Sequence, residues 1–516
     1  MGEYTKNYLY IYSTQVLSML LGMLSLFIVT PFLSSNKELY GIYAICSSLT
    51  LFYNYADIGF LGAGQKFASE AYIREEQKRE LKILGFSGMI FLLFLLILSA
   101  IILIIAINPS ILIKDISEEN VPMARSLLLI LALSSPIVCF QRIGQMLYSV
   151  RLSDYYYQLM QLVGSLLKIL SVFLFFSDGH YNIIGYYLTY QLISAFIVVL
   201  AFVFLYSKYS ISFLSVLKHF RLRRSEYLQL KDLAFASLFG TICWVLYYEL
   251  DNVFISRLIG AEAVAIYAVA FSILTIFRNI FGSLFNPYQT RFNYFVGLWD
   301  YKGLYSFVKT IIEFFIPICL IPIIIMSIVS EPFVYSWVGS GYQESIPVLI
   351  CLLFCNVLAF ISYPSGLFIT ALQKTKHLYF INGIIVLVFW IGVLISYKQL
   401  GVVSFALMKA IGMILSAIYG FVIVFHIMKE PILKFVTRLT YVYFVPVACC
   451  VSFSILAKPY MRIEKGSSDL LVNICIIVLL GMLSFLSVLV VSSLHRNKIG
   501  QMLSLIKRKI TSECGM

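Results

Sequence analysis

The chain has 516 residues, of which 61% are hydrophobic and only 12% are charged, and its mean hydropathy is +0.92. A soluble protein of this length cannot bury so much apolar surface, so we expect lipid to surround most of the chain. The net charge of +13 is spread over many connecting segments and forms no single patch, which argues against a nucleic-acid partner.

Apolar segments close to the roughly 20 residues that a helix needs to cross a bilayer follow one another along the whole chain. They predict an all-α polytopic membrane protein with about 14 transmembrane helices. The segments are 9–32, 40–61, 84–107, 122–146, 158–176, 182–206, 233–256, 262–286, 305–329, 346–370, 378–397, 402–427, 440–457 and 470–493.

The connectors between these segments are short, and their charge alternates along the chain. Most of the 38 Lys and Arg lie in one alternating set of connectors and in the two ends of the chain. Because basic residues are retained on the cytoplasmic side, both termini are predicted to be cytoplasmic.

An internal repeat divides the chain. Glu38-Leu-Tyr-Gly-Ile-Tyr43-Ala-Ile opens the second segment, and Glu262-Ala-Val-Ala-Ile-Tyr267-Ala-Val opens the eighth. The eighth comes six segments after the second, an even step, so the two halves enter the membrane from the same side and form a parallel repeat. We expect a six-helix bundle at 1–206, a basic cytoplasmic connector at 207–231, a second six-helix bundle at 232–428, and two extra helices with a basic cytoplasmic tail at 429–516.

Two short motifs resemble a known family. The second segment ends Asp57-Ile-Gly59-Phe-Leu-Gly-Ala-Gly-Gln-Lys66, and the seventh leads into the eighth through Asp251-Asn-Val-Phe-Ile-Ser-Arg-Leu-Ile-Gly260. Both are similar to the polysaccharide-transporter family, in which the basic residue of the first motif is usually Arg; Lys66 takes that place here. The resemblance covers roughly residues 1–430. The family includes O-antigen and capsule-unit flippases, within the multidrug/oligosaccharidyl-lipid/polysaccharide exporter superfamily.

This resemblance implies a V-shaped pair of bundles with a central cationic cavity and alternating access. It implies a cargo of undecaprenyl-diphosphate-linked oligosaccharide, moved outward across a bacterial inner membrane. A polysaccharide polymerase and chain-length machinery would be further partners. Asp57, Gly59 and Lys66 stand at positions of the family's first motif, and we expect them to have a structural role.

Cations inside the apolar segments are the candidate substrate-binding residues. Arg278 lies in the middle of its segment, where a charge is costly unless it meets an anion or water. It is predicted to bind a diphosphate, because a guanidinium matches phosphate oxygens; the alternative is a structural pair with a carboxylate, for which the candidates are Asp57, Asp251 and Glu313. Lys168 and Lys409 face the same cavity or reach the membrane surface. Arg142 receives a headgroup at the cytoplasmic mouth or is simply solvated.

Two neighbouring carboxylates, Glu249 and Asp251, lie near the outer part of the seventh segment. They point to different helix faces, so one of them could titrate in the cavity and couple transport to an ion. The alternative for Asp251 is a structural pair with Arg257 or with a lysine.

No nucleophile and base, metal cluster or Gly-rich phosphate loop is evident, so the chain is predicted to be a transporter without cofactors and not an enzyme. The favoured function is a flippase for a lipid-linked oligosaccharide. The alternatives are a multidrug or metabolite cation antiporter of the same fold, which needs an acidic cavity, and a polysaccharide polymerase or ligase, which needs a large external loop.

Overall fold

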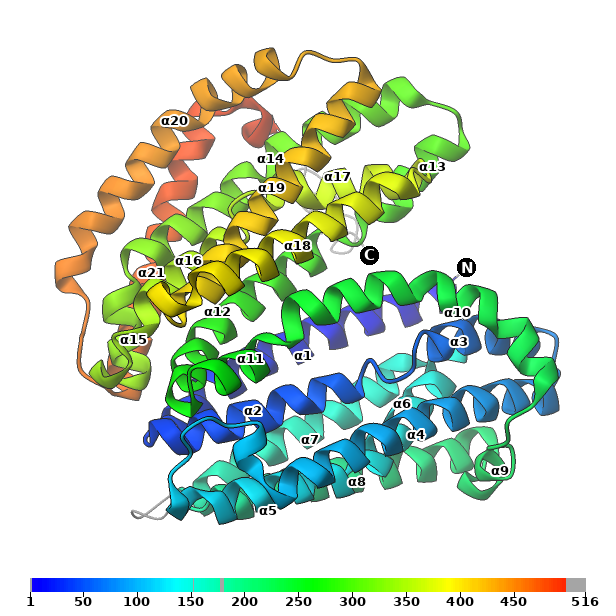
Figure 1. The fold of residues 1–516 in the computed structure, drawn as a ribbon. Coiled ribbons are helices and arrows are strands. Elements are labelled where there is room, and N and C mark those ends of the chain that lie inside the picture. Colours follow the sequence, from blue (N-terminus) through cyan, green and yellow to red (C-terminus); the bar gives the residue numbers. More distant parts are fainter. Residues whose placement is uncertain (1, 152, 177–180, 498–516) are drawn as a thin grey trace, which may run out of the picture. The chain divides into compact units, whose positions relative to one another are not determined.

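The structure is a computed structural model, and it describes residues 2–151, 153–176 and 181–497. The described residues form helices and connecting turns without strands. They fold as two compact units, Met1–Ala268 and Val269–Met516, coloured blue to green and green to red in Figure 1. The basic tail expected at the end of the chain lies, from residue 498 onward, outside the described residues.

In the first unit, α1 packs against α7, α4 packs against α3 and α5, and α7 packs against α8. The short helix α9 belongs to the basic connector. The helices of this unit are α1 (Gly2–Leu33), α2 (Lys37–Tyr53), α3 (Phe60–Ile73), α4 (Gln77–Ile107), α5 (Val121–Leu133), α6 (Ser135–Val150), α7 (Asp154–Phe175), α8 (Ile183–Tyr209), α9 (Phe213–Leu217), α10 (Arg224–Trp244), α11 (Asp251–Leu258) and the first residues of α12 (Ala261–Phe285).

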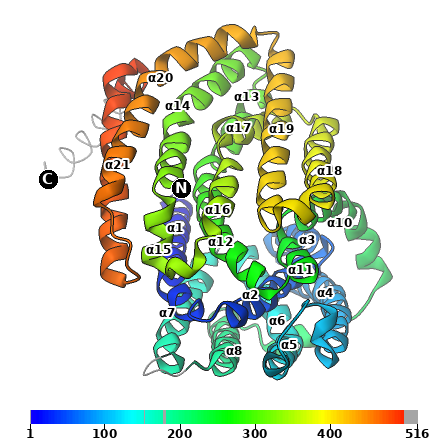
Figure 2. The same ribbon diagram turned by 60° about the vertical axis from the view of Figure 1, so that its left-hand side comes forward.

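The second unit begins within α12, and its central helix α14 contacts α17, α20 and α21. Two pairs of consecutive helices pack side by side, α18 with α19 and α20 with α21 (Figure 2). Its further helices are α13 (Tyr288–Gly297), α14 (Tyr301–Ile328), α15 (Ser330–Val338), α16 (Ser345–Phe354), α17 (Ala359–Ala371), α18 (Thr375–Leu400), α19 (Val403–Met428), α20 (Ile432–Ala457) and α21 (Ser467–Val491).

The prediction of a polytopic all-helical protein is confirmed, but the count of 14 spans is not. In the described chain, 11 helices are long and apolar enough to cross a membrane, or up to 13 if each bent pair forms one span. The segment expected at 346–370 is one such pair, α16 and α17, bent by 42°. The segment expected at 40–61 is divided, because α2 ends at Tyr53 after only 17 residues.

The break between α2 and α3 comes from the first family motif. Ile58 and Gly59 both have positive φ angles, 48° and 80°, a region that glycine enters without steric cost. The Asp57 carboxylate accepts a hydrogen bond of 3.2 Å from the backbone N–H of Leu61 in the first turn of α3. A carboxylate there satisfies an otherwise open donor of the new helix. The motif therefore ends one helix and starts the next.

The two repeated segments meet inside the first unit. A Cβ atom added to Gly41 in α2 would lie 1.9 Å from the carbonyl oxygen of Ala261, the first residue of α12. No side chain fits at that distance, so a glycine is required for this close approach. The equivalent positions of the repeat, Gly41 and Ala265, are thus not interchangeable.

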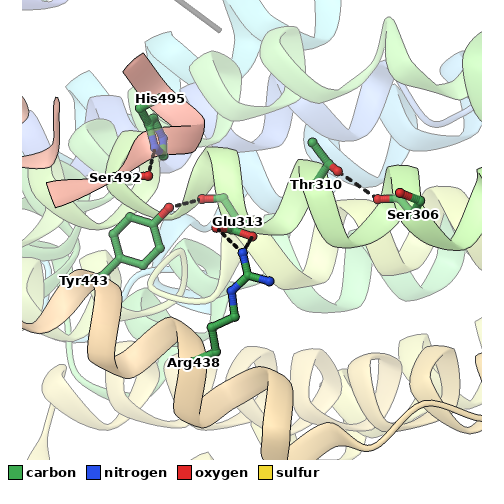
Figure 3. Close-up of polar contacts among 7 residues, drawn as sticks. All are labelled: Ser306, Thr310, Glu313, Arg438, Tyr443, Ser492 and His495. Carbon is green, nitrogen blue, oxygen red and sulfur yellow. Dashed lines mark hydrogen bonds and ion pairs between the residues drawn. The ribbon is translucent and has the colours of Figure 1, made fainter. Parts of the chain in front are cut away.

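The C-terminal helix pair is fastened to α14 by polar contacts (Figure 3). The Arg438 guanidinium of α20 lies 3.2 and 3.3 Å from the two carboxylate oxygens of Glu313. The Tyr443 hydroxyl donates to the backbone carbonyl of Glu313 at 2.7 Å. Arg438 is exposed, so the ion pair contributes little by itself, whereas the buried tyrosine contact is protected from water.

His495 completes these contacts four residues beyond the end of α21. Its side chain is fully buried, with Nε2 3.0 Å from the carbonyl oxygen of Phe314 and Nδ1 2.9 Å from the Ser492 hydroxyl. A carbonyl can only accept, so Nε2 carries the proton and Nδ1 accepts from Ser492. Burial lowers the pKa of His495 below its ordinary value, against the smaller opposing effects of the Phe314 carbonyl and the Glu313 charge. Burial therefore favours the neutral imidazole in the folded protein.

This burial predicts a loss of stability in acid. The folded state binds fewer protons than the unfolded state, so stability is complete above the unfolded pKa of about 6.5 and falls as the pH drops below it. We expect the melting temperature of the purified protein to be lower at pH 5.5 than at pH 7.5, and His495→Gln to reduce that difference. His426→Gln, at an exposed histidine, is the matched control. An unchanged pH dependence in His495→Gln would contradict this assignment.

Candidate functional site

Two of the predicted cationic residues lie along one face of α12. Lys409 of α19 is fully buried, and its Nζ atom is 5.3 Å from the ring centroid of Phe271 in α12 and 5.1 Å from that of Phe389 in α18. Arg278 lies seven residues, or two turns, beyond Phe271. Residues seven apart lie on the same face of a helix, so Lys409 contacts the face of α12 that carries Arg278. Along the helix axis, Phe271 and Arg278 are about 10 Å apart.

Arg278 is half-buried within the apolar helix α12. Its backbone carbonyl lies 3.5 Å from the hydroxyl of Tyr363 in α17, and the Tyr363 ring stacks on Phe285 at 5.0 Å. These contacts hold α12 against α17 at Arg278 and at Phe285. A guanidinium held in such apolar surroundings attracts an oxyanion strongly, because little water competes for its N–H groups.

Two of the carboxylates considered as structural partners for Arg278 make other contacts. Glu313 pairs with Arg438, and Asp251 accepts a hydrogen bond from the Tyr267 hydroxyl. Both interactions lie within a single unit of the chain. They give each of these two acids a structural contact.

The two other predicted cations, both in the first unit, have separate surroundings. Lys168 of α7 is half-buried, with its Nζ atom 3.8 Å from the ring centroid of Tyr190 in α8, a cation–π contact. Arg142 of α6 donates to the side chain of Gln145 at 3.3 Å and lies close enough to Asp57 to interact with its charge. The structure thus brings Arg142 near the first family motif and places Lys168 against an aromatic ring.

Lys66, the basic residue of the first motif, is exposed on α3. Its Nζ atom lies 5.0 Å from the ring centroid of the adjacent Phe67. Lys66 therefore differs from the buried Lys409, and its structural role in the motif stays a prediction.

Glu249 and Asp251 flank the joint between α10 and α11, which the segment Val245–Glu249 forms as a π-helical turn. Glu249 is 6% exposed and accepts a 3.1 Å hydrogen bond from the Tyr55 hydroxyl, which in turn accepts one of 2.8 Å from the Trp244 indole. Wider turns of this kind interrupt the regular helix and are frequent at functional sites. The sequence predicted an ordinary helix here.

Asp251 is 2% exposed and has a different environment from Glu249. Its partner is the Tyr267 hydroxyl in α12. Arg257, the partner considered from the sequence, instead donates to the backbone carbonyl of Ser110 at 3.2 Å. The two carboxylates point to different neighbours, so they are candidates for different roles.

One buried charge pair escaped the sequence analysis. The Arg151 guanidinium at the end of α6 lies 2.7 Å from the Glu80 carboxylate near the start of α4, and both side chains are almost inaccessible. Arg151 also stacks over Tyr72 and Tyr209, with its guanidinium carbon 5.0 and 5.5 Å from the two ring centroids. The two charges are far apart in the sequence and lie in ordinary polar connectors, so no local pattern pairs them.

Among the described residues, no three His, Cys, Asp or Glu side chains gather as ligands for a metal ion. The charges that do gather are pairs of acids and bases within each unit, together with the cations along α12. Such groups can attract an anion or exchange a proton.

The chain resembles known proteins in both sequence and fold. Residues 4–291, more than half of the sequence, match the family described as "Polysaccharide biosynthesis protein". No curated protein matches the sequence significantly.

Solved membrane transporters share the fold. The lipid II flippase MurJ in an inward closed conformation is 15% identical to this chain and superposes on it with a TM-score of 0.65. The match covers 92% of this chain and 97% of the MurJ chain. An inward-facing multidrug resistance MATE family transporter of the MOP superfamily is 16% identical, covers 79% of this chain and 93% of its own, and gives a TM-score of 0.57. The outward-facing form of such a transporter gives 0.51 at 17% identity, with coverages of 80% and 94%.

Proposed function

Because the chain belongs to the polysaccharide biosynthesis protein family and has the fold of MOP-superfamily transporters, we propose that it is a lipid-linked oligosaccharide flippase. The cargo is an undecaprenyl-diphosphate-linked oligosaccharide, either an O-antigen or a capsular repeat unit. It moves from the inner to the outer leaflet of a bacterial inner membrane by alternating access. The observation that carries the proposal is the placement of Arg278 and Lys409 along one face of α12, inside an apolar bundle.

In this proposal the diphosphate is the part of the cargo that the protein must hold. The planar guanidinium of Arg278 offers paired N–H donors to phosphate oxygens, and Lys409 adds a positive charge on the same helix face. Lys168 and Arg142, the cations predicted in the first unit, are further candidate substrate-binding residues. The polyprenyl tail needs no such site, because it stays in the lipid throughout.

Glu249 and Asp251 are the candidates for ion coupling. Glu249 ends a chain of hydrogen bonds from Trp244 and Tyr55, so a change in its protonation would be felt along the π-helical turn. Asp251 is more firmly tied to Tyr267, and we assign it the structural role.

A multidrug or metabolite cation antiporter is the second candidate. It is favoured by one observation, the burial of the neighbouring carboxylates Glu249 and Asp251, which suit a cationic cargo. The two candidates differ in the sign of the charge that is carried. Transport measured in proteoliposomes with a lipid-diphosphate oligosaccharide and with a cationic dye separates them, since a flippase moves the first and leaves the second.

The orientation proposed for the chain places both termini in the cytoplasm, because the basic connectors must stay on that side. We predict that a reporter domain fused after Asn182 or after Lys465 is external and that one fused after Arg224 is internal. Phosphatase and fluorescent-protein fusions measure this directly. An external reporter after Arg224 would reverse the orientation of every span.

The remaining partners follow from this function. An exported repeat unit is the substrate of a polysaccharide polymerase, so we place the chain beside polymerase and chain-length machinery. In this role it performs no chemistry on the glycan and needs no cofactor.

A further inference from the structure

The first unit has an apolar groove that the transport function does not use. It is lined by α6 at Pro136 and Phe140, by α8 from Ala195 to Tyr206, and by α9 at Phe213, and its volume is about 720 Å³. Nearly all of its lining side chains are hydrocarbon or aromatic. Two of its three wall helices, α6 and α8, belong to membrane-crossing segments, and Val199, Val203 and Tyr206 on its wall are exposed, so we expect lipid to reach the groove.

The length of the groove matches one leaflet of a bilayer. Its wall follows α8 from Ala195 to Tyr206, which is about 16 Å at the rise of a helix. The hydrocarbon core of a bilayer is roughly 30 Å thick, so half of it is about 15 Å. One phospholipid acyl chain has this reach, whereas an undecaprenyl chain is several times longer.

Basic residues follow the groove-lining part of α9 in the chain. Leu214 lines the groove, and Lys218 follows it by four residues, on the same face of this short helical segment. Lys218 and Arg221 are both exposed, and the connector from 207 to 232 carries more basic than acidic residues. A negatively charged headgroup would therefore be attracted to these residues.

From this geometry we propose that the groove binds one acyl chain of an anionic phospholipid, with the phosphate at Lys218 and Arg221. The proposed orientation of the chain, with its basic connectors in the cytoplasm, places this groove in the inner leaflet. The binding itself does not depend on that orientation. The cargo's polyprenyl tail is a poorer occupant, because the groove ends after the depth of one leaflet.

A lipid bound here would also support the connector. Phe213 of α9 already packs edge-to-face against Phe140 of α6 at 4.9 Å and against Phe202 of α8 at 5.1 Å. A chain in the groove covers the exposed sides of Phe213 and Leu214, which are otherwise open. The lipid thus becomes part of the packing that holds α9 onto the first unit.

Native mass spectrometry of the purified protein, titrated with dioleoyl phosphatidylglycerol or dioleoyl phosphatidylethanolamine, tests the proposal. We expect the wild-type protein to retain one phosphatidylglycerol in preference to phosphatidylethanolamine. Ala195→Trp and Val203→Trp, which fill the groove at two points, should lose that lipid. Phe196→Trp, on the same helix but outside the groove lining, should keep it.

Lys218→Gln should weaken phosphatidylglycerol binding about fivefold and leave phosphatidylethanolamine unchanged, since one basic residue near a membrane surface contributes about 1 kcal/mol. The proposal is overturned if a well-folded groove-filling variant retains the lipid, or if both phospholipids bind equally. Selective retention of undecaprenyl phosphate would overturn it in favour of the cargo tail. Melting temperature and elution profile identify well-folded variants, and two filling positions provide independent readings. Because binding is measured without transport, a failure here is distinct from a failure of the flippase function.

Discussion

Arg278→Ala is expected to abolish surface glycan while the protein level in the membrane stays normal. The substitution removes the guanidinium proposed to hold the diphosphate, and no other described cation on α12 replaces it. Arg278→Lys should restore only part of the activity, because an ammonium keeps the charge but loses the planar pair of donors. Surface glycan and membrane protein are both measured by blotting.

Two comparisons make this expectation specific. Lys398→Ala removes an exposed cation at the end of α18 and should leave glycan export unchanged. Lys168→Ala and Lys409→Ala should each do less than the two together, if both add to the potential around the cargo. Full activity of Arg278→Ala would show that Arg278 does not bind the diphosphate.

Arg151→Met is expected to destabilise the protein by about 3–5 kcal/mol, because it leaves the buried Glu80 charge without its partner. The double variant Glu80→Leu with Arg151→Met should recover most of this loss, since no charge then remains buried. Unfolding in detergent, followed by denaturant titration, gives the differences in free energy.

The matched control for this pair lies beside Glu80, at the start of α4. Arg79 and Glu76 form an ion pair of 3.0 Å with both side chains largely exposed, and Arg79→Ala should cost under about 1 kcal/mol. Equal losses in Arg79→Ala and Arg151→Met would mean that burial does not govern the strength of the Glu80–Arg151 pair.

The sequence predicted the features that depend on local pattern. Long apolar runs identified the membrane-crossing helices, and charges inside those runs singled out Arg278 and Lys409, which the structure associates with one helix face. Asp57 and Gly59 were recognised as a motif. The helix break that they create was not predicted, because the apolar run continues through it and only the backbone angles reveal the turn.

The remaining features depend on contacts between distant segments. Glu80 and Arg151 meet only because α4 and α6 pack together, and Tyr55 reaches Glu249 only because α2 and the π-helical turn are neighbours. The close approach at Gly41 likewise needs Ala261 from the other repeat. Hydrophobic periodicity carries no information about such pairs, since it reports which face is apolar and not what lies against it.

Transport in proteoliposomes under an imposed membrane potential shows whether the chain carries an anionic lipid-linked glycan. The cargo bears about two negative charges, so 100 mV contributes about 4–5 kcal/mol toward the positive side. We predict that a labelled lipid-diphosphate oligosaccharide accumulates in the leaflet on the positive side without ATP. Any added ion dependence should be weakened by Glu249→Gln. Transport that required ATP, or that was independent of both the potential and every ion gradient, would show that the chain does not move an anionic cargo in this way.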